Sequence, residues 1–292
     1  LGYTQAFSSI GGFMVAWVNG YAAEHASIFP AIHGGHEAWR YTLISGVLPA
    51  LPLIMIRPFL PESPEWQKKK DSGKLQRPSI AALFSPELRR TTILTTLGFA
   101  ASYGIAFGAI QQLPQILGAP KGGHKEVLAA GAQAQEKLKT TLAAAGKPAP
   151  TERQLKVAAA NASDAVIANI TKMQEMGGLV GRCLLAVVVL VFLSRRLQFS
   201  LFIMPALIFI PLYFNWVGGN LNTESLDLVK WGIFLAGLLT VAQFSFWGNY
   251  IPLVFPVHLR GTGESFAANI GGRIIGTAAA WITITLSESV PP

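Results

Sequence analysis

The sequence predicts an all-α integral membrane protein, and three observations support this fold class. Hydrophobic residues make up 51% of the 292 residues and charged residues only 13%, about half the charged share of soluble domains. The apolar residues gather in long blocks rather than at amphipathic spacing, as expected when lipid is the solvent. Basic residues flank these blocks, so the net charge of +8 does not indicate a nucleic-acid-binding protein.

Seven apolar blocks reach, or nearly reach, the roughly 17–25 residues that a helix needs to cross a bilayer. They lie at residues 3–23, 39–60, 91–117, 176–193, 197–217, 228–254 and 265–287. Gly177 with Gly181, and Gly272 with Gly276, have the spacing that lets two helix backbones approach closely. We therefore expect about seven transmembrane helices with close helix–helix contacts.

The basic residues of the connecting segments predict which side of the membrane each segment faces. Lys and Arg concentrate in the loops on one side, above all in segment 58–90, whereas the short loops on the other side hold Arg40 and Lys230. The positive-inside rule then places segment 58–90 in the cytoplasm and segment 118–175 outside. We expect a multi-pass protein of the inner (plasma) membrane.

Residues 118–175 differ in composition from the blocks on either side. The segment is rich in Ala, Gln and Lys, lacks aromatic residues, and is interrupted by Gly146, Pro148 and Pro150. Thr151 and Gln154 have capping-box spacing, which predicts a helix that starts there and runs into the next apolar block. We expect an external helical hairpin, either a solvated insertion or an element that binds a partner.

Two motifs lie at predicted helix ends. The second block ends in RPFLPESPEW at residues 57–66, where three prolines stop the helix, and the sixth ends in FPVHLRGTG at residues 255–263, followed by NIGGR at 269–273. These resemble the PESPRW and FPTxLRGTG…NxGR sequences after helices six and ten of the major facilitator superfamily, in its sugar-porter-like and metabolite:proton symporter branch. The chain departs from that pattern at Glu65, where Arg is usual, and at Leu253 and Val254, where a Glu is common.

Partial matches occur at Trp39-Arg40, Gly181-Arg182 and Ser194-Arg195-Arg196. The resemblance implies that the blocks correspond to helices five to eleven of a twelve-helix fold, and hence that the chain is a fragment of a longer protein. By this mapping, residues 1–66 form the last two helices of the N-terminal bundle and residues 67–90 a cytoplasmic linker. Residues 91–292 form the C-terminal bundle, helices seven to eleven, with the extracytoplasmic insertion at about 118–175.

The resemblance implies secondary active transport by alternating access, with proton symport of a small polar metabolite. Organic acids come first and sugars second, because the Gln111-Gln112 pair lies near the outer end of its block rather than midway along it. The alternative is a transporter-like receptor or structural subunit without transport activity. We do not expect an enzyme, because the sequence has no nucleophile–base or metal constellation at one depth. The absence of a P-loop argues against an ATP-driven pump.

Arg182 and Arg273 are the two arginines expected within apolar blocks. A charge inside hydrocarbon costs at least about 2.5–3.5 kcal/mol, which makes such a residue a functional candidate. A guanidinium can bind a carboxylate through two hydrogen bonds. The alternative for each arginine is a helix–helix ion pair or a side chain that extends to the membrane surface.

Amide and aromatic side chains in the sixth block predict a solute-binding face. Gln243, Trp247 and Tyr250 share a helix face at i, i+4 and i+7, and Asn249 adds a second amide. Amides left unsatisfied in lipid are costly, which favours a polar cavity over simple packing. The further candidates for substrate binding, by the same reasoning, are Tyr103, Gln111 and Asn269.

The remaining predictions concern protons, gating and metals. Glu175 is the candidate for proton coupling, and the inner-face gating residues are expected to be Arg195, Arg196, Arg260, Arg273 and Glu62. The histidines of the first outer loop, including His33 and His36, could bind zinc but are more simply solvated. We therefore expect no metal and no cofactor. The expected partners are a small-molecule substrate and the lipid bilayer, with no nucleic acid, and the protein is expected to be a monomer.

Overall fold

A computed structural model describes residues 2–61, 64–73, 78–120, 122–191, 194–221 and 225–289. In these ranges the chain is helical apart from turns, loops and an isolated β-bridge between Ile32 and Gly35. The first half contains α1 (Gly2–Glu24), η1 (Ala26–Ile28), α2 (Ala38–Ser45), α3 (Ala50–Ile56), η2 (Arg57–Phe59), α4 (Pro64–Asp71), η3 (Ala81–Phe84), α5 (Arg89–Gly108), η4 (Ile110–Gln112), α6 (Leu113–Leu117) and α7 (Lys125–Ala144). The second half contains α8 (Glu152–Val191), α9 (Arg195–Asn220), α10 (Leu226–Val254), η5 (Val257–Leu259), α11 (Arg260–Phe266), η6 (Ala267–Gly276) and α12 (Thr277–Ser289). The predicted all-α class is confirmed.

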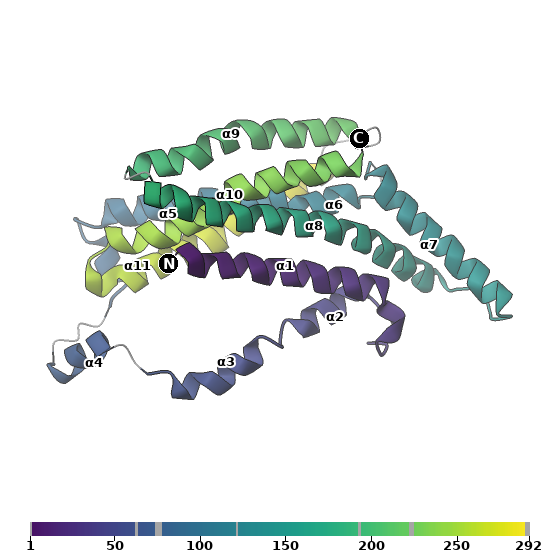
Figure 1. The fold of residues 1–292 in the computed structure, drawn as a ribbon, viewed down its shortest axis with the longest axis horizontal. Helices are drawn as coiled ribbons and strands as arrows, with labels where there is room; N and C mark the ends of the chain where they lie inside the picture. Colours follow the sequence, from purple (N-terminus) through teal and green to yellow (C-terminus); the bar gives the residue numbers. More distant parts are fainter. Residues whose placement is uncertain are drawn as a thin grey trace.

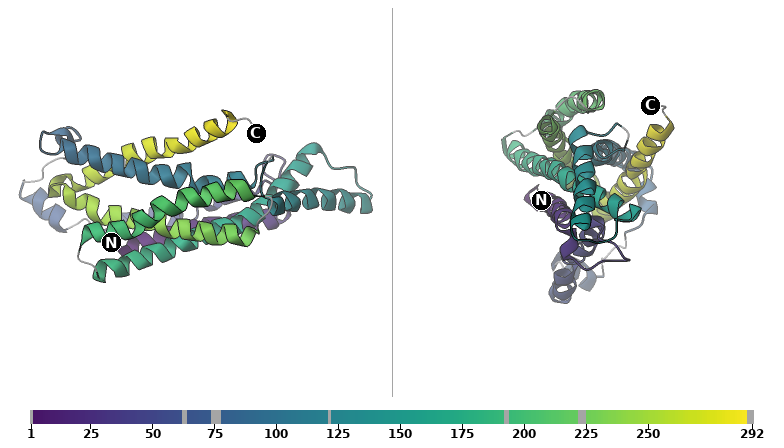
Figure 2. Two further views of the ribbon diagram at one scale, coloured as in Figure 1. Left: turned by 90° about the horizontal axis from the view of Figure 1, so that it is seen from above. Right: turned by 90° about the vertical axis from the view of Figure 1, so that its right-hand side faces the viewer.

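The long helices lie side by side in an elongated bundle (Figure 1). α8 packs against both α1 and α10, α9 packs against α10, and α5 packs against η6 and α12. The left-hand view of Figure 2 shows α5 and α12 next to each other, with the α7–α8 hairpin extending beyond the other helices at the opposite end from α4. Segments far apart in sequence, such as α1 and α8, therefore form one interface.

The surface of the bundle carries many large apolar side chains. Ile233 and Ala236 of α10 are fully buried, in one cluster with Tyr213 of α9. On the outer side of α9, by contrast, Leu207 is 67% exposed and Leu212 is 63% exposed. Water-soluble proteins rarely present such extended apolar surfaces, so hydrocarbon is the solvent that suits this bundle.

Four helical segments of the described chain are long and apolar enough to cross a membrane: Ala38–Phe59, Arg89–Leu117, Arg195–Asn220 and Leu226–Gly248. They match four of the seven predicted blocks. The blocks at 3–23 and 265–287 are also helical, as is the described part of the block at 176–193, residues 176–191. The block at 265–287 is divided among α11, η6 and α12. In α8, Glu175 lies just before the apolar block and Arg182 lies within it. The structure therefore supports an all-α membrane protein, with a clear spanning signal in fewer segments than the sequence pattern indicates.

The predicted hairpin is present, and α8 continues through it into the bundle. Thr151 N donates to Gln154 Oε1 (2.8 Å), and Gln154 N donates to Thr151 Oγ1 (3.3 Å), which is the reciprocal pattern of a capping box. From Glu152 to Val191 the helix has 40 residues, a length of about 60 Å. It is therefore about twice as long as the hydrocarbon core of a bilayer is thick.

Two predicted helices are interrupted. The expected helix at 39–60 is divided into α2 and α3 by a turn at residues 46–49, where Gly46 and Pro49 interrupt the regular pattern. The expected helix at 265–287 contains a ten-residue π-helix, η6. There a Cβ added to Gly271 would stand 2.1 Å from the Thr96 carbonyl oxygen, so η6 lies directly against the α5 backbone.

The Gly177 and Gly181 pair brings two helix backbones together, as its spacing predicts. A Cβ at Gly177 would stand 2.0 Å from the carbonyl oxygen of Phe234, and a Cβ at Gly181 would stand 2.2 Å from that of Leu238. Glycine is therefore needed at both positions for α8 to reach α10. This contact places the next residue of α8, Arg182, in the interior of the bundle.

Candidate functional site: a charged cavity between α1, α5, α8 and α10

A cavity of about 440 Å³ lies in the interior of the bundle. Its walls come from α1, α5 with η4, α8, α10, and the start of the α11–η6 segment. Its polar and charged lining residues are Ser8, Ser9, Tyr103, Gln111, Gln174, Glu175, Arg182, Thr240 and Glu264. This volume is in the range of small-molecule binding pockets.

Arg182 is the most deeply buried charged residue of this cavity, with 7% of its surface exposed. Its Nη1 donates to the Ser8 hydroxyl of α1, and the Tyr103 ring of α5 lies within electrostatic range. A buried guanidinium is retained only where polar groups compensate for lost solvation. The cavity therefore presents a preorganised positive charge.

Glu175 lies on the same side of α8 as Arg182, seven residues earlier. Seven residues correspond to about two turns, or roughly 10 Å along the axis. The two charges attract each other electrostatically, and Gln174 Nε2 donates to Glu175 Oε1 at 3.5 Å. A second carboxylate, that of Glu264 at the start of the α11–η6 segment, lines the cavity on another side. The site thus contains one guanidinium group and two carboxyl groups.

Aromatic rings of α5 and α10 form another part of the cavity wall. Tyr103 of α5 makes an edge contact with Phe244 of α10, with ring centroids 5.0 Å apart, and stacks on Phe107 at 5.6 Å. All three residues line the cavity, as does Phe99. Flat apolar surfaces facing charged groups suit a small polar solute that has one apolar face.

Tyr103, Gln111, Arg182 and Glu175 are therefore the predicted site residues that the fold brings to one cavity. Gln111, in η4, is exposed and lies at the edge of the cavity. The predicted roles in substrate binding and proton coupling remain predictions, because position alone does not establish them.

The predicted face of α10 points to other helices. Trp247 Nε1 donates to Ser102 Oγ of α5 at 2.8 Å, and Gln243 is buried with its Nε2 directed to the Leu239 carbonyl oxygen at 3.4 Å. Tyr250 donates its hydroxyl hydrogen to Gln198 Oε1 of α9 at 2.7 Å. Residues on the adjoining face of α10, including Val241, Phe244 and Gly248, line the cavity instead.

Two other substrate-binding candidates lie away from the cavity lining or outside the description. Asn269 is exposed, and its Nδ2 donates to the Ser265 carbonyl oxygen at 2.8 Å, within its own helical segment. The side chain of Asn249 lies outside the described residues.

The inner-face candidates lie near the helix ends expected to face the cytoplasm. The Arg195 guanidinium lies over the Tyr250 ring at 4.8 Å, and Arg260 Nε donates to the Phe255 carbonyl oxygen at 3.4 Å. Arg196 and Arg273 are exposed, and Glu62 lies outside the described residues. The Arg195 contact joins the start of α9 to the end of α10.

Sequence reasoning did not identify the α1 wall of the cavity. Ser8, Ser9 and Gly12 all line it, and Ser9 is 2% exposed. The run of small and polar residues at positions 8–12 was the available signal, because small side chains leave room for a cavity. Its role became evident only from the packing of α1 on α8.

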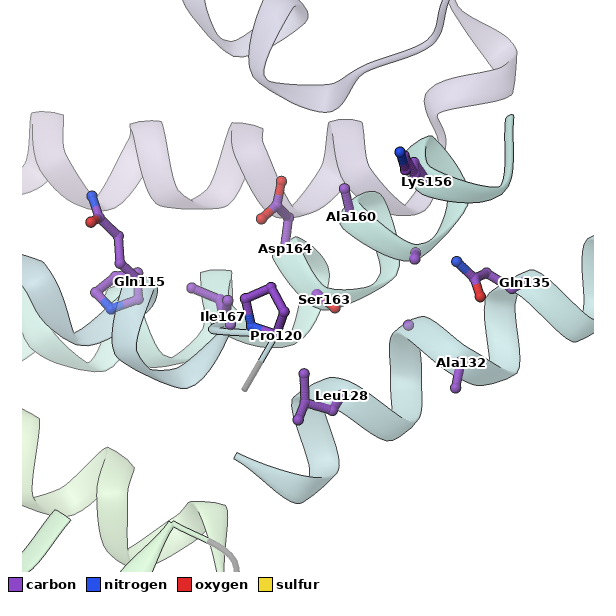
Figure 3. Close-up of a pocket in the computed structure, with 14 residues that line it drawn as sticks. Gln115, Pro120, Leu128, Ala132, Gln135, Lys156, Ala160, Ser163, Asp164 and Ile167 are labelled. Atoms are coloured by element: carbon purple, nitrogen blue, oxygen red, sulfur yellow. The ribbon is translucent and has the colours of Figure 1, made fainter. Parts of the chain in front are cut away.

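A larger cavity, of about 730 Å³, lies in the hairpin region (Figure 3). α8 contributes Lys156, Ser163 and Asp164, α7 contributes Leu128, and the loop before α7 contributes Pro120. Lys156 is paired with Glu152 at 2.6 Å. Because this hairpin cavity lacks the buried guanidinium and aromatic wall, the cavity around Arg182 is the stronger candidate site. Among the described residues, no group of three or more His, Cys, Asp or Glu is arranged to hold a metal ion.

The apolar surface, the helical bundle and the charged interior cavity define a multi-pass membrane protein with an internal polar site. Residues 1–110 match the family model described as sugar (and other) transporter. Over 57 residues the chain is 40% identical to the inner membrane metabolite transport protein YgcS of Escherichia coli (strain K12). That alignment covers 20% of this chain and 13% of the relative. No solved structure matches significantly.

These matches agree with the motifs at the helix ends and support the resemblance to the major facilitator superfamily. The family model and the Escherichia coli relative are both described as transporters.

Proposed function

We propose that the protein is a secondary active transporter that moves a small organic anion across the inner membrane by alternating access, coupled to protons. The observation that carries the proposal is the buried Arg182 guanidinium. It shares a cavity of about 440 Å³, a volume suited to a small solute, with Glu175 and several aromatic rings. The transport function stated for the Escherichia coli relative supports the same class of activity. We further propose that segment 58–90 is cytoplasmic and that segment 118–175 is extracytoplasmic.

The chemistry of Arg182 favours an anion over a neutral sugar. A guanidinium can form two parallel hydrogen bonds with a carboxylate, and each is stronger than a bond between neutral groups. The Tyr103 and Phe244 rings leave an apolar surface for the carbon skeleton of the solute. A sugar could use the rings and the amides but could not form the paired, charge-assisted hydrogen bonds that a carboxylate forms with a guanidinium, so sugars rank second.

The spacing of Glu175 and Arg182 provides a mechanism for coupling. An ionised Glu175 carboxylate attracts Arg182 and therefore competes with a substrate carboxylate for it. A proton on Glu175 removes this competitor and so strengthens anion binding. By linkage, a bound anion strengthens proton binding to Glu175 by the same free energy. Proton and anion would then load together, which is symport.

The position of the cavity suits alternating access. α1 contributes one wall and α5, α8 and α10 contribute the others. In the mapping that the family resemblance implies, α1 belongs to the N-terminal bundle and the others to the C-terminal bundle. A site between two bundles becomes accessible from one side and then the other as the bundles rock.

The test is solute counterflow and uptake in liposomes that contain the purified protein, with a panel of labelled small organic anions and hexoses. We expect anion exchange that falls at least about tenfold in Arg182→Gln, because a hydrogen-bonded charge contributes roughly 1.5–3 kcal/mol. Arg182→Lys should retain part of the activity, because it keeps the charge but loses the fork geometry. Arg90→Gln is the matched control, since Arg90 is exposed at the start of α5 and lies outside the cavity lining.

Coupling is tested separately with Glu175→Gln. This variant should still exchange labelled anion for unlabelled anion but should no longer accumulate it in response to an imposed proton gradient. Normal gradient-driven accumulation would exclude Glu175 as the coupling residue. Anion exchange at the wild-type rate in Arg182→Gln would overturn the anion assignment. A folded protein that exchanges no solute of the panel would instead support the receptor alternative.

A further inference from the structure

The loop between α1 and α2 is fastened to the hairpin half of α8 by an ion-pair network. Arg153 Nη2 of α8 lies 3.0 Å from Glu37 Oε1 and donates to the His33 carbonyl oxygen at 3.1 Å. The other carboxylate oxygen of Glu37 lies 3.2 Å from Arg40 Nη1. The hydrogen bond from Arg153 keeps the pKa of the Glu37 carboxyl below its ordinary value, so Glu37 is ionised at neutral pH.

Asn161, about two turns further along α8, makes two more bonds with the same loop. Its Nδ2 donates to the His36 carbonyl oxygen at 2.9 Å, and its Oδ1 accepts from the Ala38 backbone N–H at 3.2 Å. Ala38 is the first residue of α2, where backbone N–H groups have no partner within the helix. Asn161 therefore caps the start of α2, although it lies more than a hundred positions away in the sequence. We call Glu37, Arg153 and Asn161, with the backbone of residues 33–38, the outer clasp.

The helices between the outer clasp and the Arg182 cavity are packed closely. A Cβ added to Gly20 of α1 would stand 3.1 Å from the Cβ of Ala168 of α8. Ala22 and Ala23, further toward the clasp, are 1% and 7% exposed. The fourteen residues from Asn161 to Glu175 span about 21 Å along α8. Small residues thus bring α1 close to α8 on the hairpin side of the cavity.

We infer that the hairpin half of α8 is a gate brace, in which the outer clasp holds the ends of α1 and α8 together and keeps the Arg182 cavity closed to the extracytoplasmic side. The inference rests on the proposed function and on the sidedness proposed with it. It assigns the hairpin a role within the transport cycle, in place of a solvated insertion or a docking site for another protein. Opening toward the outside then requires the clasp bonds to break.

The chemistry of the clasp suits repeated opening. The Arg153 side chain is 55% exposed, so water can replace its bonds when the loop leaves. Exposed ion pairs and single hydrogen bonds each contribute modestly to stability. Breaking them alters the balance between closed and open states without unfolding α1 or α8. The structure, with all these bonds formed, corresponds to the closed side of that balance.

The test measures access to the cavity directly, with a reporter cysteine at Ser9 in a Cys183→Ser background. Cys183 is free and exposed, so it would otherwise react. Intact cells are treated with a membrane-impermeant thiol reagent, and the labelling rate of the Ser9→Cys protein is recorded. We expect labelling about threefold faster in Arg153→Ala and about tenfold faster in Arg153→Ala with Asn161→Ala, because the clasp bonds add.

Lys156→Ala is the matched control, because Lys156 lies on the same helix and pairs with Glu152 rather than with the α1–α2 loop. A second reporter, Ala236→Cys, guards against partial unfolding, because Ala236 is fully buried in α10. Faster labelling at Ser9→Cys with none at Ala236→Cys supports the gate brace. Equal rates in the clasp variants and Lys156→Ala, or labelling at both reporters, overturns it.

The labelling result is independent of the transport assay. Faster labelling in a protein that exchanges no solute would retain the clasp and refute the proposed function. Normal solute exchange with unchanged labelling would retain the proposed function and refute the clasp.

Discussion

Gly12 of α1 lies directly against Glu175 of α8: a Cβ added at Gly12 would stand 2.4 Å from a carboxylate oxygen of Glu175. Both residues line the Arg182 cavity. The glycine therefore sets where the Glu175 carboxylate can lie, and with it the separation between the two opposite charges on α8.

Gly12→Ala should impair coupling while leaving the fold intact. The obstructed atoms are the end of a flexible side chain, so Glu175 can turn aside and α1 need not move. We expect melting of the detergent-solubilised protein within about 2 °C of the wild type, with gradient-driven accumulation reduced several-fold. Gly11→Ala is the control, because no described atom lies within 4 Å of its Cβ position. Unchanged accumulation in Gly12→Ala would show that the position of Glu175 does not matter.

Gly181→Ala should act on folding rather than on transport chemistry. Its Cβ would stand 2.2 Å from the Leu238 carbonyl oxygen, and a backbone atom of α10 cannot turn aside as a side chain does. Overpacking of this kind costs about 1–3 kcal/mol. We expect a lower melting temperature and less monodisperse protein on size-exclusion chromatography. Gly218→Ala in α9, with no described atom within 4 Å of its Cβ position, should melt no lower than the wild type.

Asp164→Asn should stabilise the protein at neutral pH. Burial at the hairpin cavity raises the pKa of Asp164 above its ordinary value, because the charged form loses solvation. The wild type therefore loses stability as pH rises from about 3.9 through the raised folded value. Asparagine removes that cost, so we expect a melting temperature roughly 2 °C higher at pH 7 and a difference that vanishes toward pH 4.

Asp227→Asn serves as the control for that series. Asp227 lies in the first turn of α10 and pairs with Lys230 at 2.9 Å. Its charge is compatible with the helix dipole, so removing it should not raise the melting temperature. A stabilised Asp227→Asn, or an Asp164→Asn difference that grows at acid pH, would contradict the desolvation argument.

Local sequence signals were reliable where a few neighbouring residues decide the structure. The capping box at Thr151 and Gln154 predicted the start of α8, and both of its hydrogen bonds are present. The spacing of Gly177 and Gly181 predicted a close backbone contact, and α10 makes it. The interrupted helix at 39–60 was missed because apolar composition continues through the turn at Gly46 and Pro49.

The face of α10 that lines the cavity could not be read from its residue types. Amides and aromatic rings at membrane depth suggest a polar site, yet Trp247 donates to Ser102 of α5 and Gln243 donates to the Leu239 carbonyl oxygen of its own helix. α10 packs against α8, α9 and α5, so its sequence shows little contrast between a lipid face and an interior face. Neighbouring helices, rather than its own pattern, decide which residues meet the cavity.

By itself, the sequence determined that the protein is helical and belongs in a membrane, because lipid demands long apolar blocks and internally satisfied backbone hydrogen bonds. It also indicated Arg182 as a functional candidate, because a charge within an apolar block is costly to place in hydrocarbon. Only the tertiary structure decided that Ser8, Gly12 and Glu175 surround that charge and that Arg153 reaches Glu37. Such contacts join residues more than a hundred positions apart, and they depend on how α1 packs along α8, which no local pattern encodes.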